Sequence, residues 1–499
     1  MTRSFPPNLS KLHLALLGVS LIFVATVVAL VIAVLQSWQA FNSLKSWQIE
    51  AAYRYGQRAQ PIVRVADELT FHKITALRSW RLELELISEI PTAKDMMTSA
   101  LEGGRFENPS RLISLAREFE QSSQQSKKIS AAIDLLELFL TEKTRWVVVF
   151  QNSDELRATG GFIGSWAEIE LEKGQITDFK ILDVYEADGR FEGFRPAPPG
   201  VTEYLSQGQG WRLPDANWSP HFPTSAQTFL DFLSDSDFNG YTGLVAVNLD
   251  FFENLLQVTG PVFLPDFGVT ATTQNVSALA RADREQFFPG SKAKTNFLTS
   301  LYTQFKIKLG QMLDQEFTKT GLKLANSFNQ AQADYAFQTF SPDPNTQSAL
   351  SSLDLDGQTL DLDQKQSGLG IFESNVGINK ANAGVDRIIE TEQLDYRTFL
   401  TVTFTNHNSL DNLNEGGDYV NYLRLVTTQN LKLDKVSIDG QEVDTWQEIS
   451  PNSLPKGFKE FGQLVIVPQQ KVVTVRYEIS HPKLENQHTF FRQPGVIPI

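Results

Sequence analysis

Cysteine is absent from this chain of 499 residues. The protein therefore has no disulfide, no thiolate metal ligand and no cysteine nucleophile. Histidine is scarce, and the six histidines are scattered at spacings that match no zinc-binding pattern. The Gly-x-Ser-x-Gly elbow of acyl-transfer enzymes and the phosphate-binding Gly-Lys-Ser/Thr loop are also missing. The sequence thus excludes several classes of enzyme, and it predicts no metal site of the zinc type.

Basic residues are in deficit as well. The chain has 44 lysines and arginines against 58 aspartates and glutamates, a formal charge of −14. A non-specific nucleic-acid binder needs a basic face, so we expect no nucleic-acid partner. Adhesion to an anionic membrane surface by charge alone is disfavoured for the same reason. The 41% of hydrophobic and 20% of charged residues are those of an ordinary globular protein, and the length allows about two to four domains.

One long apolar run lies near the N-terminus. Residues 14–35 read LALLGVSLIFVATVVALVIAVL without a charged side chain, and as a helix they would span about 33 Å, enough to cross a bilayer. A cleaved signal peptide is the alternative, but its apolar core usually has about 7–15 residues. Its cleavage site also needs small residues, and Trp38 stands where cleavage after Ala40 would require one. We therefore expect an uncleaved transmembrane helix at 14–36.

The charges around this run predict its orientation. Arg3 and Lys11 precede it, whereas Lys45 and Glu50, which follow it, cancel each other. The positive-inside rule therefore places the tail 1–13 in the cytoplasm. We expect a single-pass protein of the cell membrane, with the bulk of the chain outside the cytoplasm.

The rest of the chain changes its hydrophobic period twice. Residues 37–142 carry apolar residues at helical spacing, with breaks expected at Pro61 and Pro91, and predict a helical stalk or bundle. From 143 to 370, short apolar runs such as RWVVVFQ alternate with amphipathic helical patterns, which predicts a mixed α/β domain. From 371 to 499, short alternating segments separated by turn residues predict an antiparallel β-sandwich. The predicted fold class is a multidomain α+β protein.

The stretch FQNSDELRATGGFIGSW, residues 150–166, follows a predicted buried strand. Ligands of open α/β sheets bind at the carboxyl ends of strands, so its side chains are candidates for a ligand site. Arg157 offers a planar fork for phosphate or carboxylate, and Asp154 with Glu155 could hold magnesium. A pair of glycines lets a backbone approach a ligand closely or adopt a positive φ. The candidate ligand-binding residues here are Asn152, Glu155, Arg157, Gly160 and Gly161.

The same residues also admit a structural interpretation. Asn152 and the glycines would then form a tight turn, and Glu155 would pair with Arg157 as a buried ionic staple. Charged clusters beside a strand are more often structural than catalytic. Both interpretations stay open, and no catalytic residue is assigned.

The stretch QNSDELRATGGFIGSW resembles the hallmark of a bacterial envelope family called domain of unknown function 4012. Three later stretches are similar to the same family, and the resemblance covers roughly residues 140–480. It implies an envelope protein, but the family has no settled activity to carry over. The three stretches are LPDANWSPHFPTSAQ (213–227), GYTGLVAVNLDFFENLLQVTGPVFLP (240–265) and SNVGINKANAGVDR (374–387).

The order of elements is also similar to that of the LytR-CpsA-Psr phosphotransferases. Those single-pass membrane proteins move glycopolymers from polyprenyl pyrophosphate carriers onto the cell wall. The resemblance implies arginines on the pyrophosphate, with Arg157, Arg281 and Arg284 as counterparts, and an aspartate with magnesium, for which Asp183 is the counterpart. An amphipathic helix face explains Arg281 and Arg284 equally well, as solvated charges.

Two functions stay open on the sequence alone. The first is an extracytoplasmic cell-envelope protein that binds or transfers a lipid-linked glycopolymer or a cell-wall component. The cofactor of such a protein is unknown, and magnesium is expected only if the protein works in the manner of a phosphotransferase. The second is a non-catalytic envelope scaffold or adhesion protein. A deep basic pocket beside Arg157 would favour the first function, and a closed core in which Asn152, Glu155 and Arg157 satisfy one another would favour the second.

Overall fold

The computed structural model of the chain describes residues 49–69, 75–89, 95, 113–114, 116–118, 127–282, 293–360, 367–409, 416–449, 454–481 and 488–496. The predicted transmembrane helix at 14–36 and the tail 1–13 lie outside these ranges. Of the helices within them, none is long and apolar enough to cross a membrane. The chain forms two compact units, and the second carries the candidate site. The structure thus has the α+β class that the sequence predicts, with several sheets besides its helices.

The first unit contains the N-terminal helices. The expected break at Pro61 is wrong, because one helix runs through that proline, while Pro91 lies outside the described residues. Ala59, Val63 and Leu84 pack together as a small core, so the first two of these helices meet through the apolar faces that the helical spacing indicates. These helices are α2 (Ile49–Leu69), α3 (Thr75–Ser88) and α6 (Lys127–Thr141).

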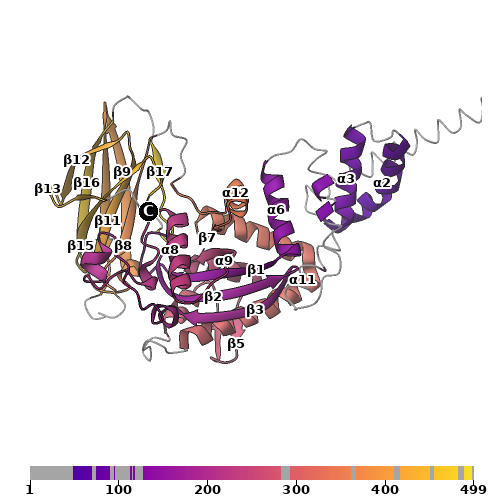
Figure 1. Ribbon diagram of the computed structural model, residues 1–499, viewed down its shortest axis with the longest axis horizontal. Helices are drawn as coiled ribbons and strands as arrows, with labels where there is room; N and C mark the ends of the chain where they lie inside the picture. The colour runs from indigo at the N-terminus through magenta and orange to yellow at the C-terminus, as the bar shows by residue number, and fades with distance from the viewer. Residues whose placement is uncertain are drawn as a thin grey trace, which may run out of the picture. The chain divides into compact units, whose positions relative to one another are not determined.

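The second unit begins with a five-stranded sheet in the order β3-β2-β1-β4-β7 (Figure 1). The predicted buried strand is β1, which is the middle strand of the sheet. Its Val147 and Val149 are buried. β1 and β4 run parallel, whereas β1–β2 and β4–β7 are antiparallel. The carboxyl ends of β1 and β4 therefore share one edge. The strands are β1 (Lys143–Asn152), β2 (Phe162–Glu172), β3 (Gln175–Asp183), β4 (Gly243–Val247) and β7 (Phe337–Phe340).

Helices and two short strands surround this sheet. The helix Leu249–Thr259 ends at Gly260, which has a φ of 70°, and the Asn248 side chain accepts the Phe251 N–H at its start. The helix Ala293–Ala333 is interrupted by non-helical torsions at Glu316. The elements are α7 (Val184–Asp188), α8 (Phe222–Asp235), α9 (Leu249–Thr259), β5 (Val262–Leu264), β6 (Val269–Ala271), α10 (Val276–Ala282), α11 (Ala293–Ala333) and α12 (Pro344–Ser352).

The remaining strands build two five-stranded sheets around one core, which is the arrangement of a β-sandwich. Their orders are β13-β12-β16-β10-β9 and β14-β15-β11-β8-β17. Leu400, Val402 and Phe404 of β10 point inward and are fully buried, as the alternating pattern predicts. The strands are β8 (Gly368–Asn375), β9 (Val385–Leu394), β10 (Arg397–Asn406), β11 (Tyr419–Thr428), β12 (Lys432–Ile438), β13 (Gln441–Glu442), β14 (Gln447–Ile449), β15 (Phe458–Val467), β16 (Val472–Ser480) and β17 (Thr489–Phe491).

Candidate functional site

The loop after β1 is folded by its own backbone. The Asn152 side-chain oxygen accepts the Asp154 N–H at 3.2 Å, and the Asn152 carbonyl accepts the Glu155 N–H at 3.2 Å. The Glu155 carbonyl accepts the Phe162 N–H at 2.8 Å, which closes the loop onto the first residue of β2. This is the tight turn of the structural interpretation, with Asn152 as its organiser.

Gly161 is required by a neighbouring backbone. Its φ is +153°, and a Cβ atom at this position would lie 2.3 Å from the carbonyl carbon and oxygen of Asn152. Gly160 has a φ of +127°, and a Cβ there would lie 3.2 Å from the Gln151 side-chain oxygen. The close approach that the glycine pair predicts therefore exists, but other parts of the chain fill the space.

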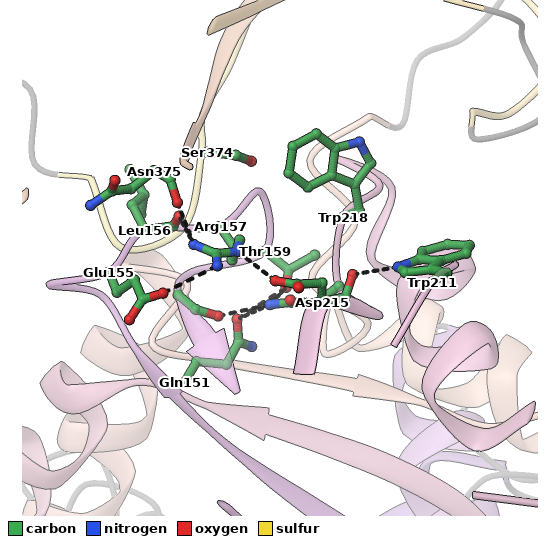
Figure 2. A network of polar contacts seen from close by, with 12 residues as sticks. Gln151, Glu155, Leu156, Arg157, Thr159, Trp211, Asp215, Trp218, Ser374 and Asn375 are labelled. Atoms are coloured by element: carbon green, nitrogen blue, oxygen red, sulfur yellow. Dashed lines mark hydrogen bonds and ion pairs between the residues drawn. The ribbon is translucent and has the colours of Figure 1, made fainter. Parts of the chain in front are cut away.

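Arg157 lies at the centre of a closed hydrogen-bond network (Figure 2). Its Nε donates to Asp215 Oδ1 at 3.0 Å, and its Nη2 donates to Glu155 Oε1 at 3.2 Å. Its Nη1 donates to two backbone carbonyls, that of Asn375 at 2.7 Å and that of Leu156 at 3.1 Å. Four of the five N–H donors of a guanidinium are thus used within the protein. Only 1% of Arg157 is exposed.

The charge of Arg157 is balanced inside the protein. Burial alone would lower the pKa of Arg157, but the carboxylates of Asp215 and Glu155 outweigh it, so the pKa is raised. The Phe162 ring lies beneath the guanidinium, 5.5 Å from ring centroid to Cζ. Because the ion pairs are shielded from water, Arg157 is held in its charged form as part of the core.

The family-like stretches meet around this arginine. Asp215 belongs to LPDANWSPHFPTSAQ, and Asn375 belongs to SNVGINKANAGVDR. The second of these stretches also reaches the loop through Asn382, whose Nδ2 donates to the Ser153 carbonyl at 2.6 Å and whose N–H donates to the Asp154 carbonyl at 3.2 Å. The loop after β1 is therefore bonded to the entry of the β-sandwich by both backbone and side chain.

The C-terminal segment adds a further link. Gln493 Nε2 donates to the Arg157 carbonyl at 3.1 Å and to the Glu373 carbonyl at 2.9 Å, and Gln493 Oε1 accepts the Glu373 N–H at 2.7 Å. Glu373 lies on β8, so one amide side chain joins the β1 loop to a strand of the sandwich. Nothing in the sequence singles out Gln493 for this role.

A second buried arginine, Arg424 of β11, joins the same two parts. Its Nη1 donates to the Trp218 carbonyl at 2.7 Å and to Glu460 Oε1 at 3.1 Å, and its Nη2 donates to Ser374 Oγ at 2.8 Å. Its Cζ lies 4.6 Å from the Trp218 ring centroid, and that ring stacks on Tyr422. Burial lowers the pKa of Arg424, and the carboxylate of Glu460 acts against this. The Asn-Trp-Ser-Pro stretch therefore packs against one face of the sandwich, where Trp218 contacts Arg424 and Tyr422 of β11.

Asp183 serves as a helix cap. Its Oδ1 accepts the Tyr185 N–H at 2.9 Å at the start of α7. Burial raises the pKa of Tyr185 to about 12, and the carboxylates of Glu155, Asp215, Asp183 and Asp188 add to this effect. The carboxylate of Asp183 and those of Glu155 and Asp215 thus all act on Tyr185. The geometry gives Asp183 a structural role, which is to cap α7.

The two other arginines implied by the phosphotransferase resemblance are not brought to the site by any described contact. The backbone of Arg281 lies in α10, and Arg284 lies outside the described residues. Within the part of the chain that the structure describes, no group of three or more acidic, histidine or cysteine side chains could hold a metal ion. The geometry therefore assembles Asn152, Glu155, Arg157 and the glycines into one cluster, which is a buried junction.

Three of the residues at this junction were not among the candidates from sequence. Asp215 and Trp218 stand in a stretch that the family resemblance had marked, but their partners lie far along the chain. Arg424 lies between Leu423 and Leu425 on β11. A charged residue between two leucines of a strand is the signal that the sequence offers for it.

Comparisons with known proteins agree with part of the family resemblance. The model of the family described as "Protein of unknown function (DUF4012)" matches residues 141–284. Among solved structures, the X-ray structure of the Lin1025 protein from Listeria innocua is similar at 11% identity, covers 43% of this chain and 81% of that chain, and has a TM-score of 0.23, too low to carry an argument. No curated protein matches the chain. The likeness to the LytR-CpsA-Psr phosphotransferases stays a prediction. Residues 141–284, which include β1 and the Arg157 loop, are thus the part of the chain that is similar to the family of unknown function 4012.

Proposed function

We propose that this chain is a membrane-anchored, extracytoplasmic envelope protein that works as a non-catalytic scaffold or interaction protein. The apolar run 14–35 supports the anchor, and the helices of 37–142 would be its stalk. The observation that carries the proposal is the burial of Arg157, four of whose five N–H donors are used by the chain itself. The polar side chains of the stretch 150–166 hold the α/β sheet against the β-sandwich. We therefore interpret Arg157 and its carboxylate partners as a structural staple, a buried ion-pair cluster that joins these two parts.

The competing function is the binding or transfer of a lipid-linked glycopolymer. It would need the Arg157 guanidinium to reach a pyrophosphate, and a charge-assisted bond of that kind requires free N–H donors. Opening the network would leave the carboxylates of Glu155 and Asp215 without their cation, which is costly in a buried site. The buried geometry around Arg157 therefore favours the scaffold over the transferase.

A binding experiment separates the two functions. The full-length chain in detergent is titrated with a polyprenyl pyrophosphate analogue in the presence of magnesium, alongside Arg157→Lys. We expect no saturable binding to either protein. Arg476→Lys is the matched control, because Arg476 is an arginine of the sandwich surface with an exposed side chain. Saturable binding that Arg157→Lys abolishes, while Arg476→Lys retains it and circular dichroism shows both variants folded, would overturn the proposal.

The placement of the chain is tested separately. A tag fused to the C-terminus should be removed by protease added to intact cells, because the part of the chain after 36 is proposed to lie outside the cytoplasm. A tag on the tail 1–13 should survive that treatment and be lost only after permeabilisation. Protection of the C-terminal tag in intact cells would contradict the proposed topology and leave the interpretation of Arg157 untouched.

A further inference from the structure

β9 forms an open edge of the β-sandwich. It is the last strand in the order β13-β12-β16-β10-β9, and among the described residues it pairs with β10 alone. The pairing is regular over ten residues, from Val385 opposite Asn406 to Leu394 opposite Arg397, without a register shift. Among the described residues no strand pairs with the other side of β9, where the N–H and C=O groups of alternate residues face away from β10. A long regular edge is a template for pairing.

The two ends of this edge differ in burial. Val385 and Arg387 point into the sandwich and are buried, whereas residues 390–397 are exposed on both faces of the hairpin that β9 and β10 form. The second half of the strand therefore extends beyond the core of the sandwich. The core of the sandwich does not cover this segment. A partner strand that covered it would therefore bury the most exposed apolar surface of the edge, which favours binding.

The outward face of β9 has a distinct chemical pattern. Because side chains alternate along a strand, this face reads acidic, apolar, acidic, acidic, apolar. Ile388 is 47% exposed and Leu394 is 59% exposed, which is unusual for large aliphatic side chains on a sheet. The residues in order are Asp386, Ile388, Glu390, Glu392 and Leu394.

The acidic positions are only partly neutralised. Glu392 lies 3.5 Å from Arg476, and Asp386 lies 2.8 Å from the His407 ring. Glu390 has no ion pair within the described residues. A second copy of β9 alongside the first would place carboxylates against carboxylates, which is unfavourable. The edge is therefore complementary to a basic strand and not to itself.

We propose that β9 accepts an extended, basic strand from a partner protein by β-augmentation. In the antiparallel register, lysine or arginine of the partner would stand opposite Glu392, Glu390 and Asp386, and aliphatic side chains would stand opposite Leu394 and Ile388. This inference rests on the proposed scaffold function and names the surface through which the scaffold takes a partner. Charges on an edge strand can also serve only to prevent pairing, and the experiment below includes that outcome.

The probe is a nine-residue peptide that carries the complementary pattern, Val-Thr-Arg-Thr-Arg-Thr-Val-Thr-Lys. A matched peptide has glutamate in place of its three basic residues. Binding of each to the full-length chain in detergent is measured by fluorescence anisotropy at low ionic strength, where exposed charge pairs contribute most. We expect saturable binding of the basic peptide and none of the acidic one.

Backbone pairing is separated from simple charge attraction by N-methylation. In a strand, the N–H groups of odd and even residues point to opposite edges. Methylation of one set should abolish binding, and methylation of the other set should leave it almost unchanged. The double variant Glu390→Lys/Glu392→Lys should weaken binding by about tenfold. Glu448→Lys is the control, because Glu448 is an exposed glutamate on the three-residue edge strand β14.

Several results would overturn the inference. They are no binding of the basic peptide at millimolar concentration, equal binding of both N-methylated forms, or an equal loss in Glu448→Lys and the double variant. Dimerisation of the chain that Glu390→Lys/Glu392→Lys changes would assign the edge to a second copy and also overturn it. None of these results touches Arg157, so failure of the inference is distinguishable from failure of the proposed function.

Discussion

Arg157 is stabilised by partners that would themselves be destabilised without it. Removing one member of a buried ion pair leaves an uncompensated charge and typically costs about 3–5 kcal/mol. We therefore expect Arg157→Met to lower the free energy of unfolding by about that amount, because Glu155 and Asp215 would keep their charge beside an apolar side chain. Urea unfolding of the full-length chain measures this.

The control for that change is Arg476→Met, which breaks an exposed pair with Glu392 at 3.5 Å. Exposed pairs contribute roughly 0–1 kcal/mol, so this variant should unfold almost as the parent protein does. Equal losses in the two variants would mean that the Arg157 network contributes no more than a surface pair, and the staple would have to be abandoned.

His221, which precedes α8, gives stability a dependence on pH. Burial lowers its pKa from 6.5 to about 4, and its Nδ1 lies 2.7 Å from Thr224 Oγ1. As the pH falls below 6.5, the unfolded state takes up a proton that the folded state refuses, so stability present above pH 6.5 is lost toward pH 4. His221→Asn should therefore lose about 1 kcal/mol less than the parent between pH 7.5 and 5.5.

The comparison with the variant is needed because Asp250 acts in the opposite sense. Burial, with help from the carboxylates of Glu253, Asp334 and Asp154, raises the pKa of Asp250 to about 6. The folded state then binds a proton that the unfolded state lacks between pH 3.8 and 6, so this group stabilises the fold as the pH falls. Since both proteins retain Asp250, their difference isolates His221. Identical pH dependence of the two urea midpoints would show that His221 is not buried as a neutral group.

At the scale of the elements, the turn from β1 to β2 depends on Gly161. In Gly161→Ala the Cβ atom would fall 2.3 Å from the Asn152 backbone, so β1 or the loop must move. We expect a loss of about 3 kcal/mol or more in the free energy of unfolding. Gly208→Ala is the control, because Gly208 also has a positive φ, +81°, but has no atom within 4 Å of the new Cβ.

That control should cost only about 1 kcal/mol, the strain of a positive φ in a residue with a side chain. Thermal unfolding of the two variants gives the comparison. Equal shifts of the unfolding temperature would indicate that the backbone of the loop relaxes easily, and that its packing against Asn152 contributes little.

Which elements could be predicted follows from how each is buried. β10 has one face on the core and one face on solvent, so its alternation predicts the strand. β8 is buried along its whole length, because Phe372, on the side away from the core, packs in a second cluster of buried apolar side chains. A strand without an exposed face has no period of two, so the pattern of β8 does not predict a strand. The pattern of β9 does not predict one either, because half of this strand is exposed on both faces.

At the scale of the molecule, the junction could not be predicted. The sequence places an amide, two carboxylates and a guanidinium at the end of a strand, and it allows a staple as readily as a ligand site. What decides between them is Asp215, 58 residues from Arg157, and Asn375, 218 residues from it. No local pattern specifies such a pairing, because the partners are chosen by the way the sandwich folds back onto the sheet.

The junction also makes a prediction about cooperativity. Arg157, Arg424 and Gln493 tie the α/β sheet to the sandwich within one compact unit, so the two should unfold together. Hydrogen exchange followed by mass spectrometry should give β2 and β11 the same free energy of opening. Trp218→Ala removes the ring that stacks on Tyr422 and lies over Arg424. We expect a loss of about 3–5 kcal/mol and a separation of the two opening free energies.

Trp446→Ala is the matched control for this change. Trp446 is half-buried and packs on Phe461 against the sandwich core, 5.5 Å between ring centroids, so its loss should weaken the sandwich without touching the contacts of Trp218. β2 and β11 should then still open together, at a lower common free energy, because the contacts of Trp218 with Tyr422 and Arg424 remain in place. Separate opening of β2 and β11 in the parent protein would contradict the junction itself. It would also remove the reason to interpret Arg157 as a staple, because a staple between the α/β sheet and the β-sandwich must couple their unfolding.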